Sequence, residues 1–245
     1  MSAHPPIAVG TEFQQAESAQ RARLASSSGH LAGQFAEHIA GHLDSRVKRG
    51  FDLTAALCAL LLLLPIFLLI ALLIRAYDGG PAFYRHRRVG RGQSGFDCLK
   101  FRTMRTDSQE ALRLYLSSNP AALAEWAETQ KLKDDPRITP VGAILRKTSL
   151  DELPQLINIL RGEMSVVGPR PIVEAEVEKY GSDAAAYFAV RPGLTGAWQV
   201  SGRSDTSYAE RVRLDRQYVE SQSFRGDLVI ILRTIPAVFF TRGSY

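Results

Sequence analysis

The longest stretch without a charged residue runs from Leu53 to Ile74. It is about 22 residues long, close to the roughly 20 residues that a helix needs to cross the hydrocarbon core of a bilayer. Pro65 lies in its middle, where it removes a backbone hydrogen bond and tends to bend the helix. Both flanks are basic, so the positive-inside preference does not select an orientation. The pattern favours a re-entrant helix hairpin, which enters and leaves on one face, over a straight span.

This helix divides the chain into three parts. Residues 1–45 are rich in Ala, Ser, Gln and Gly and are expected to form a disordered leader, with one weak helix over residues 34–42. Residues 46–76 hold the membrane helix and its basic flanks. Residues 77–245 are expected to form a single cytoplasmic domain.

The domain begins with a predicted hairpin. Segments 82–87 and 96–101 are typical of short strands, and the glycines between them indicate a hairpin loop. Helices are expected over residues 108–133 and 207–221.

The last apolar segment, residues 228–240, is interrupted by Arg233 and Pro236 and is too broken to span a membrane. Either it lies in the membrane interface or it packs in the core. The predicted fold class is therefore α+β and mainly helical: a re-entrant membrane helix hairpin, a small cytoplasmic domain with a short β-hairpin, and interfacial amphipathic helices.

Positive charge is concentrated around the apolar run. The net charge is +5, and the basic residues near the run are Arg46, Lys48, Arg49, Arg75, Arg85, Arg87, Arg88, Arg91, Lys100, Arg102 and Arg105. Beside a bilayer-length segment, such residues are typical of contacts with anionic headgroups, and phosphate-bearing substrates fit them equally. Nucleic acid is disfavoured as a partner because no nucleic-acid-binding motif accompanies the charge.

The number and positions of the histidines and cysteines limit the classes of reaction that the chain could catalyse. Four of the five histidines lie in the leader and only His86 lies in the domain, which argues against serine-hydrolase chemistry and histidine-based zinc sites. Cys58 lies inside the apolar run and Cys98 outside it, so no disulfide is expected. Catalysis is expected to depend on carboxylates, basic groups or a hard metal ion.

Adjacent carboxylates at Asp151 and Glu152 are the main candidates. Pro154 is tolerated only in the first turn of a helix, so a helix should begin at about Ser149 to Asp151. Free N–H groups and the helix dipole favour ionised carboxylates there. An ionised aspartate can attack phosphorus, and a carboxylate pair can hold Mg²⁺ together with substrate phosphates. Ordinary helix capping explains the same two residues.

Several cations could bind phosphate. Lys100 and Arg102 are two residues apart on a predicted strand, so they share a face and could grip a diphosphate, although a solvated basic edge is an equal interpretation. Prolines flank Arg170 and one follows Arg191, so both guanidinium groups are presented on stiff backbone. Either turn could also be purely structural.

Five of these motifs occur in an order that resembles the bacterial sugar transferase family, the monotopic phosphoglycosyl transferases that start exopolysaccharide and O-antigen assembly. The resemblance covers residues 47–245. Its motifs are KRGFD at 48–52, KFRTM at 100–104, RKTSLDELPQ at 146–155, VGPRP at 167–171 and RPGLTG at 191–196.

The sequence departs from many members of the family at two places. Leu64 stands where they have a serine before the bend proline. Ala197-Trp198-Gln199 stands where they read Trp-Ala-Gln, an order that resembles the branch handling galactose-1-phosphate. The chain also looks like the short class, without the multi-span N-terminal region of larger relatives.

The resemblance implies roles for particular residues. Asp151 would be the nucleophile, and Glu152 its partner in a site for Mg²⁺, with Mn²⁺ as a substitute. The remaining implied positions are the phosphate-binding residues Lys100, Arg102 and Arg146, the nucleotide-positioning Arg170, the further substrate-binding residues Gln155, Pro169 and Arg191, and the membrane bend at Pro65.

The implied reaction has two steps. The aspartate attacks the sugar-linked phosphate of a UDP-sugar and UMP leaves, and undecaprenyl phosphate then attacks the phosphosugar-enzyme. The implied location is the inner bacterial membrane, with the domain on its cytoplasmic face. The resemblance is also compatible with a homodimer. A catalytically silent membrane scaffold and a tethered nucleotide or nucleic-acid binder are the competing functions, and both leave Asp151 and Glu152 unexplained.

Overall fold

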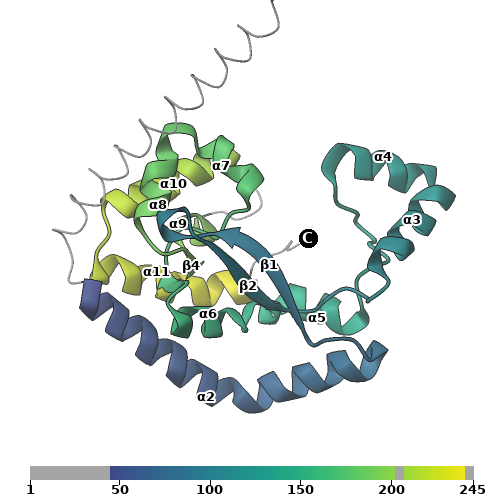
Figure 1. Ribbon diagram of the computed structural model, residues 1–245, viewed down its shortest axis with the longest axis horizontal. Helices are drawn as coiled ribbons and strands as arrows, with labels where there is room; N and C mark the ends of the chain where they lie inside the picture. Colours follow the sequence, from purple (N-terminus) through teal and green to yellow (C-terminus); the bar gives the residue numbers. More distant parts are fainter. Residues whose placement is uncertain (1–44, 202–206, 241–245) are drawn as a thin grey trace, which may run out of the picture.

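The computed structural model describes residues 45–201 and 207–240. The predicted leader, apart from Ser45, and its weak helix lie outside the described residues. The first element is the 34-residue helix α2 (Ser45–Asp78), which contains Pro65. In the described part of the chain, α2 is the one helix long and apolar enough to cross a membrane. Figure 1 shows that it changes direction in its middle, as the position of the proline predicts.

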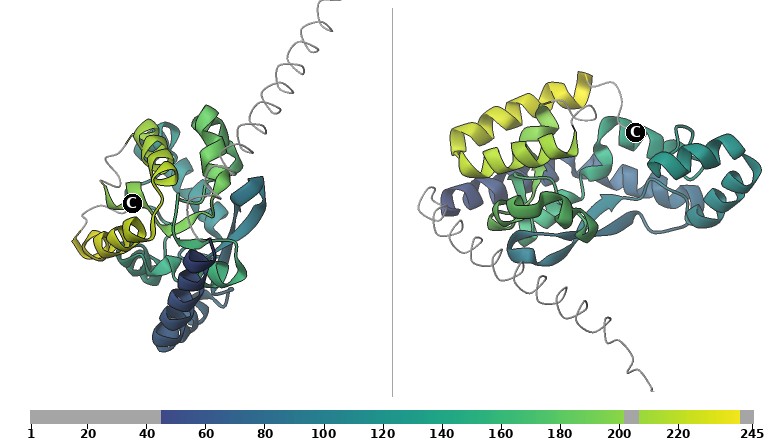
Figure 2. Two further views of the ribbon diagram at one scale, coloured as in Figure 1. Left: turned by 90° about the vertical axis from the view of Figure 1, so that its left-hand side faces the viewer. Right: turned by 90° about the horizontal axis from the view of Figure 1, so that it is seen from above.

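Helix α2 lies along one side of the domain, and α7 and α8 lie on the opposite side (Figures 1 and 2). Ala56 packs against the hairpin and α6, and Phe67, Ile70 and Ile74 pack in a second cluster with Phe101. Its other face is apolar and exposed, and comprises Leu57, Leu61, Leu62, Leu64, Ile66, Leu68, Leu69, Leu72 and Leu73. An apolar face of this size is what a helix in contact with lipid presents.

The N-terminal end of α2 is bound to the domain by buried polar contacts. Lys48 Nζ lies 2.5 Å from Asp227 Oδ2 and also donates to the Val167 carbonyl at 3.1 Å. The carboxylate of Asp52 is buried and accepts hydrogen bonds of 3.0 Å from Ser165 Oγ and the Val166 N–H.

The C-terminal end of α2 is bound to the same domain. Asp78 accepts a hydrogen bond of 2.6 Å from Arg102 Nη1 and a second one from Arg102 Nη2. The backbone N–H of Thr106 donates to the same carboxylate at 3.2 Å. Both ends of α2 are therefore held by one body.

The predicted hairpin is confirmed. Strands β1 (Phe83–Val89) and β2 (Gly95–Phe101) are antiparallel, with His86 opposite Cys98, and the short helix η1 (Arg91–Gln93) lies in the loop between them. Residues directly opposite each other point to the same face of a sheet. Cys98 and Lys100 therefore share a face with His86 and Arg88, the face that borders the site described below.

The predicted helix over residues 108–133 is in fact two helices, α3 (Ser108–Ser118) and α4 (Pro120–Thr129). Asn119 divides them, because its side chain accepts from the Ala122 N–H and caps α4, whose first residue is a proline. The pair projects away from the rest of the domain (Figure 1).

The carboxylate segment lies between two helices, α5 (Pro140–Thr148) and α6 (Gln155–Arg161). Gly142 allows α5 to approach the segment after β2 closely, because a Cβ atom at this position would lie 2.1 Å from the Thr103 carbonyl oxygen. Between α5 and α6, Ser149 adopts a left-handed conformation (φ 58°) and is followed by the short helix η2 (Leu150–Glu152). Asn158 of α6 is fully buried and accepts from the Leu99 N–H of β2.

The rest of the domain surrounds a second, parallel sheet of β3 (Ser165–Val167) and β4 (Gly193–Thr195). The remaining helices are α7 (Glu174–Tyr180), η3 (Gly181–Asp183), α8 (Ala184–Ala189), α9 (Ala197–Val200), α10 (Tyr208–Glu220) and α11 (Phe224–Phe240). Helix α10 confirms the prediction for residues 207–221.

Helix α11 packs against the core through one face, and its interfacial location stays a prediction. Asp227 is buried against α2, whereas Leu228, Val229, Leu232 and Ile235 are exposed. The fold class is α+β and mainly helical, as predicted.

Candidate functional site

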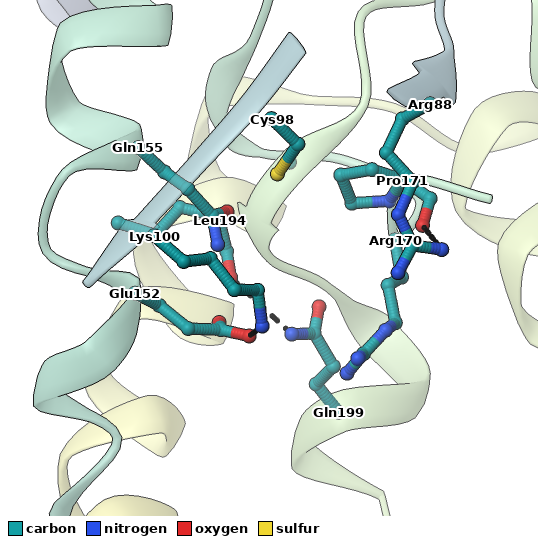
Figure 3. A pocket seen from close by; sticks show the side chains of 10 residues that line it. Arg88, Cys98, Lys100, Glu152, Gln155, Arg170, Pro171, Leu194 and Gln199 are labelled. Carbon is teal, nitrogen blue, oxygen red and sulfur yellow. Dashed lines mark hydrogen bonds and ion pairs between the residues drawn. The ribbon is translucent and has the colours of Figure 1, made fainter. Parts of the chain in front are cut away.

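A pocket opens where the hairpin, the η2–α6 segment and the loops around β3 and β4 meet. Its lining residues are Arg88, Cys98, Lys100, Glu152, Gln155, Arg170, Pro171, Gly193, Leu194 and Gln199. Figure 3 shows Lys100 and Glu152 on one side of this pocket and Arg88 and Arg170 on the other. Three cations therefore face a single carboxylate of the lining, a balance that suits an anionic ligand.

Lys100 joins the two candidate catalytic carboxylates. Its Nζ lies 2.7 Å from Glu152 Oε1 and 3.6 Å from Asp151 Oδ2. All three side chains are at least three-quarters buried. The arrangement places two acidic groups around one positive charge at the edge of the pocket.

The two carboxylates have different acidities. Burial, together with the charge of Glu152, raises the pKa of Asp151, although Lys100 and Arg146 act in the opposite direction. Burial also acts to raise the pKa of Glu152, but Lys100 and Arg170 outweigh it and hold that pKa below its usual value. Ionisation of both groups therefore stays a prediction, and for Asp151 burial acts against it.

Helix capping does not account for the pair. The short helix η2 begins after Ser149, and α6 begins only at Gln155, with Pro154 as its cap residue. In these two described helices, the cap residues Ser149 and Pro154 form no side-chain hydrogen bond to the backbone N–H groups. Asp151 and Glu152 instead contact Lys100 of a distant strand.

Arg146 of α5 interacts electrostatically with Asp151. Its Nε donates to Thr103 Oγ1 at 2.9 Å, and its charge favours the ionised form of Asp151. Burial lowers the pKa of Arg146 itself, while the charge of Asp151 acts to raise it. Arg146 is thus a partly buried positive charge that acts on the candidate nucleophile.

Arg170 is presented by rigid backbone, as its flanking prolines predict. Pro169 is fully buried, and its carbonyl accepts from the Gly193 N–H at 2.7 Å. Gly193 is required there, because a Cβ atom would lie 2.1 Å from the Gly168 backbone nitrogen. The Arg170 guanidinium carbon lies 5.8 Å from the centre of the Trp198 ring, which supports its planar face.

Three of the predicted substrate-binding cations, Arg102, Arg146 and Arg191, do not line this pocket. Arg102 follows the end of β2 and donates to Asp78 and to the Pro81 carbonyl, so it does not form a clamp with Lys100. Arg191 Nε donates to the Gly162 carbonyl at 2.8 Å. Gln155 does line the pocket, and Pro65 lies in the bent part of α2.

Arg88 is a pocket residue that sequence reasoning missed, because all the cations near the apolar run were interpreted as one group. The signal was present in strand alternation, which places Arg88 on the same face as Lys100. Asn158 was missed as well, because a polar residue on a short helix gives no sign that it will be buried.

The donor groups fit a hard divalent cation. Asp151 and Glu152 supply oxygen ligands, which Mg²⁺ prefers. Among the described residues, no group of three or more His, Cys, Asp or Glu side chains is placed to hold a metal ion. Substrate phosphates and water would therefore complete the coordination of Mg²⁺, as is common at phosphate-binding sites.

The chain is similar to known proteins over most of its length. The model of the bacterial sugar transferase family matches residues 43–241. The exopolysaccharide production protein ExoY of Rhizobium meliloti (strain 1021) is 59% identical over 203 residues, covering 83% of this chain and 90% of that protein.

Two longer relatives are also similar. The UDP-galactose-lipid carrier transferase of Erwinia amylovora is 50% identical over 208 residues, covering 85% of this chain and 43% of that protein. The undecaprenyl-phosphate galactose phosphotransferase of Salmonella typhimurium is 47% identical over 199 residues, covering 81% of this chain and 42% of that protein. The chain thus matches less than half the length of these two relatives.

Proposed function

The chain belongs to the bacterial sugar transferase family, and on that premise we propose that it transfers a sugar-1-phosphate from a UDP-sugar to undecaprenyl phosphate and releases UMP. It is a sugar phosphotransferase that acts on a polyprenyl-phosphate lipid, as the names of its relatives indicate. The observation that carries the finer proposal is the contact of Lys100 with Asp151 and Glu152 at the edge of a cationic pocket.

In the first step, an ionised oxygen of Asp151 attacks the sugar-linked phosphorus of the donor. A new bond forms between this oxygen and phosphorus, and the bond to the bridging oxygen breaks, so that UMP leaves with the electron pair. In the second step, an oxygen of undecaprenyl phosphate attacks the same phosphorus. The Asp151 carboxylate is released, and the product is the lipid diphosphate sugar.

The surrounding residues have distinct tasks. Lys100 and Arg146 offset negative charge around Asp151 and favour its ionised form. Arg170, on rigid backbone at the other side of the pocket, binds the nucleotide phosphate. Mg²⁺ held by Asp151 and Glu152 would neutralise charge on the donor phosphates.

A re-entrant α2 is supported by the contacts at its two ends. Lys48 and Asp52 at one end and Asp78 at the other are all bound by side chains or backbone of the same domain. A straight span would carry these ends to opposite faces of the bilayer and break one set of contacts. We therefore place both ends and the domain on the cytoplasmic side of the inner membrane.

Labelling of single cysteines tests this topology. Val47→Cys and Tyr77→Cys, in a background without Cys58 and Cys98, place thiols at exposed positions near the two ends of α2. Both thiols should react only with reagents that enter the cytoplasm. Periplasmic labelling at either position would contradict the re-entrant arrangement but would leave the chemistry of Asp151 unaffected.

The sugar is proposed from the relatives. Two of them are named for transfer of galactose, and the Ala197-Trp198-Gln199 order points to the same branch, so galactose-1-phosphate is the expected group. Release of UMP from a panel of UDP-sugars, with the full chain, Mg²⁺ and undecaprenyl phosphate, tests donor and reaction together. Equal rates with UDP-glucose and UDP-galactose would contradict the choice of sugar.

Asp151→Asn tests the nucleophile. The amide keeps the shape of the side chain but cannot form the phosphoryl bond, so UMP release should fall to background. A variant that retains more than about a tenth of the wild-type rate would exclude a covalent role, since this loss is only about 1.4 kcal/mol of barrier.

A further inference from the structure

Arg88 of β1 lines the pocket next to β2, the strand that carries Lys100. In the hairpin register, Arg88 is opposite Phe96 and His86 is opposite Cys98, so Arg88 shares the pocket face with Cys98 and Lys100. Its neighbour Arg87 points to the other face, where its exposed side chain lies 3.5 Å from Asp97. Adjacent arginines on one strand thus have entirely different surroundings.

The guanidinium of Arg88 is held in a fixed position. Nη1 donates to the Pro171 carbonyl at 3.1 Å, and Nη2 donates to His86 Nδ1 at 3.2 Å. Glu176 Oε2 lies 3.6 Å from Nη1, which is beyond hydrogen-bond distance for an N–H donor. The Arg88 side chain is only 13% exposed, so its orientation is set by the protein rather than by solvent.

His86 can accept this hydrogen bond because it is neutral. Burial, followed by the charges of Arg88 and Lys100, lowers its pKa. An arginine offers only donors, so the neutral ring must present the lone pair of Nδ1 to Arg88. The one histidine of the domain therefore helps to orient the guanidinium of Arg88.

These contacts leave the charge of Arg88 incompletely compensated. Two of its three partners are neutral acceptors, and burial together with the charge of Arg170 lowers the pKa of Arg88. Lys100 is paired with Glu152 on the other side of the pocket, whereas Arg88 and Arg170 lie together (Figure 3). Two partly buried like charges at one end of a pocket suit an anion that binds between them.

We propose that Arg88 binds the nucleotide-linked phosphate of the donor together with Arg170. This inference rests on the proposed function, because Asp151 and Lys100 place the attacked, sugar-linked phosphate at the other side of the pocket. The phosphate between Arg88 and Arg170 then remains on UMP when the bond to the bridging oxygen breaks. The two guanidinium groups stabilise the charge that develops on this leaving group.

Arg88→Gln in the full chain tests the proposal, with Arg87→Gln as the matched control from the same strand. Direct calorimetric titration with UMP and with UDP, each with Mg²⁺, measures phosphate binding without turnover. Arg88→Gln should weaken both nucleotides by a similar factor, roughly 10- to 100-fold for a lost charged hydrogen bond. Arg87→Gln should change either affinity less than about twofold, because its ion pair is exposed.

The nucleotides also locate the contact. If Arg88→Gln weakened UDP but not UMP, Arg88 would bind the sugar-linked phosphate and the assignment would be wrong. If Arg88→Gln bound UMP as tightly as the control Arg87→Gln, Arg88 would have no role in binding the nucleotide. Should Arg88→Gln melt well below the wild type, Arg88→Lys decides, because lysine keeps the charge but lacks the planar guanidinium that contacts Pro171 and His86 and still has donors left for a phosphate. A loss of UMP affinity of about fivefold or more in a stable Arg88→Lys variant supports the proposal, and an unchanged affinity overturns the guanidinium contact with the phosphate.

UMP release by the wild type separates this inference from the proposed function. If the wild type releases UMP but Arg88→Gln binds UMP normally, the inference fails and the function stands. If the wild type releases no UMP but binds it in an Arg88-dependent way, the two-arginine phosphate site stands and the proposed reaction fails.

Discussion

Asn158→Ala should both destabilise the domain and slow the reaction. Asn158 Oδ1 accepts from the Leu99 N–H at 2.9 Å, and Nδ2 donates to the Asp97 carbonyl at 2.8 Å. Nδ2 also donates to Glu163 Oε2 at 2.6 Å. The side chain thus takes the place of a third strand along the free edge of β2, the strand that carries Lys100.

The expected magnitude follows from the groups that lose their partners. Alanine leaves a backbone N–H and a backbone carbonyl of β2 without protein partners, and each such buried group costs about 1–3 kcal/mol. A small cavity adds to this cost, so the free energy of unfolding should fall by about 3–5 kcal/mol. For a chain of this size, that corresponds to a fall in melting temperature of roughly 10 °C.

Thermal unfolding in detergent at a fixed scan rate, followed by measurement of UMP release well below the transition, tests both effects. Ser117→Ala is the control, because its hydroxyl donates only to the Leu114 carbonyl at an exposed position of α3. The control should melt within about 2 °C of the wild type. A similarly small change for Asn158→Ala would show that water replaces the amide and that Asn158 does not hold β2 in place.

Three further predictions concern the site and the core. Arg170→Lys should raise the KM for the UDP-sugar and not that for the lipid, because lysine lacks the planar fork; a defect confined to the lipid would contradict the position of Arg170. Excess chelator should abolish UMP release and Mg²⁺ or Mn²⁺ should restore it; full activity without divalent cations would exclude a metal role. Burial raises the pKa of Asp215 from 3.8 to about 7. Protonation of Asp215 therefore stabilises the folded state. This contribution to the free energy of unfolding, up to about 4 kcal/mol, is fully present below about pH 4 and is lost as the pH rises through 7. Asp215→Asn should therefore flatten the dependence of melting temperature on pH, and a profile that overlays the wild type would refute this.

The parts of the fold that were predicted correctly have local signals. Alternation and glycines identified the β1–β2 hairpin, and a periodic pattern identified α10. Strands β3 and β4 were not predicted, because each has three residues and their pairing joins segments far apart in the chain. Their sequence pattern carries no sign of the partner, so only the folded domain defines them.

The site shows the same limit. Lys100, Asp151 and Glu152 come from motifs far apart in the chain, and the structure brings them into contact. Strand alternation was extended one residue too far when Arg102 was paired with Lys100. Strand β2 ends at Phe101, and Arg102 turns to Asp78 instead. Nothing local to Arg102 marks this partner, which lies 24 residues earlier in the chain.

The ion pairs at the two ends of α2 become available at different times during synthesis. Arg102 follows Asp78 by 24 residues, whereas Asp227 follows Lys48 by 179 residues. The entropic cost of closing a loop rises only from about 3 to about 5 kcal/mol between these lengths. The longer separation therefore adds little to the free-energy cost of forming the Lys48–Asp227 pair. The C-terminal end of α2 is therefore locked early by the emerging hairpin. The ion pair at the N-terminal end of α2 can form only after α11 has been synthesised.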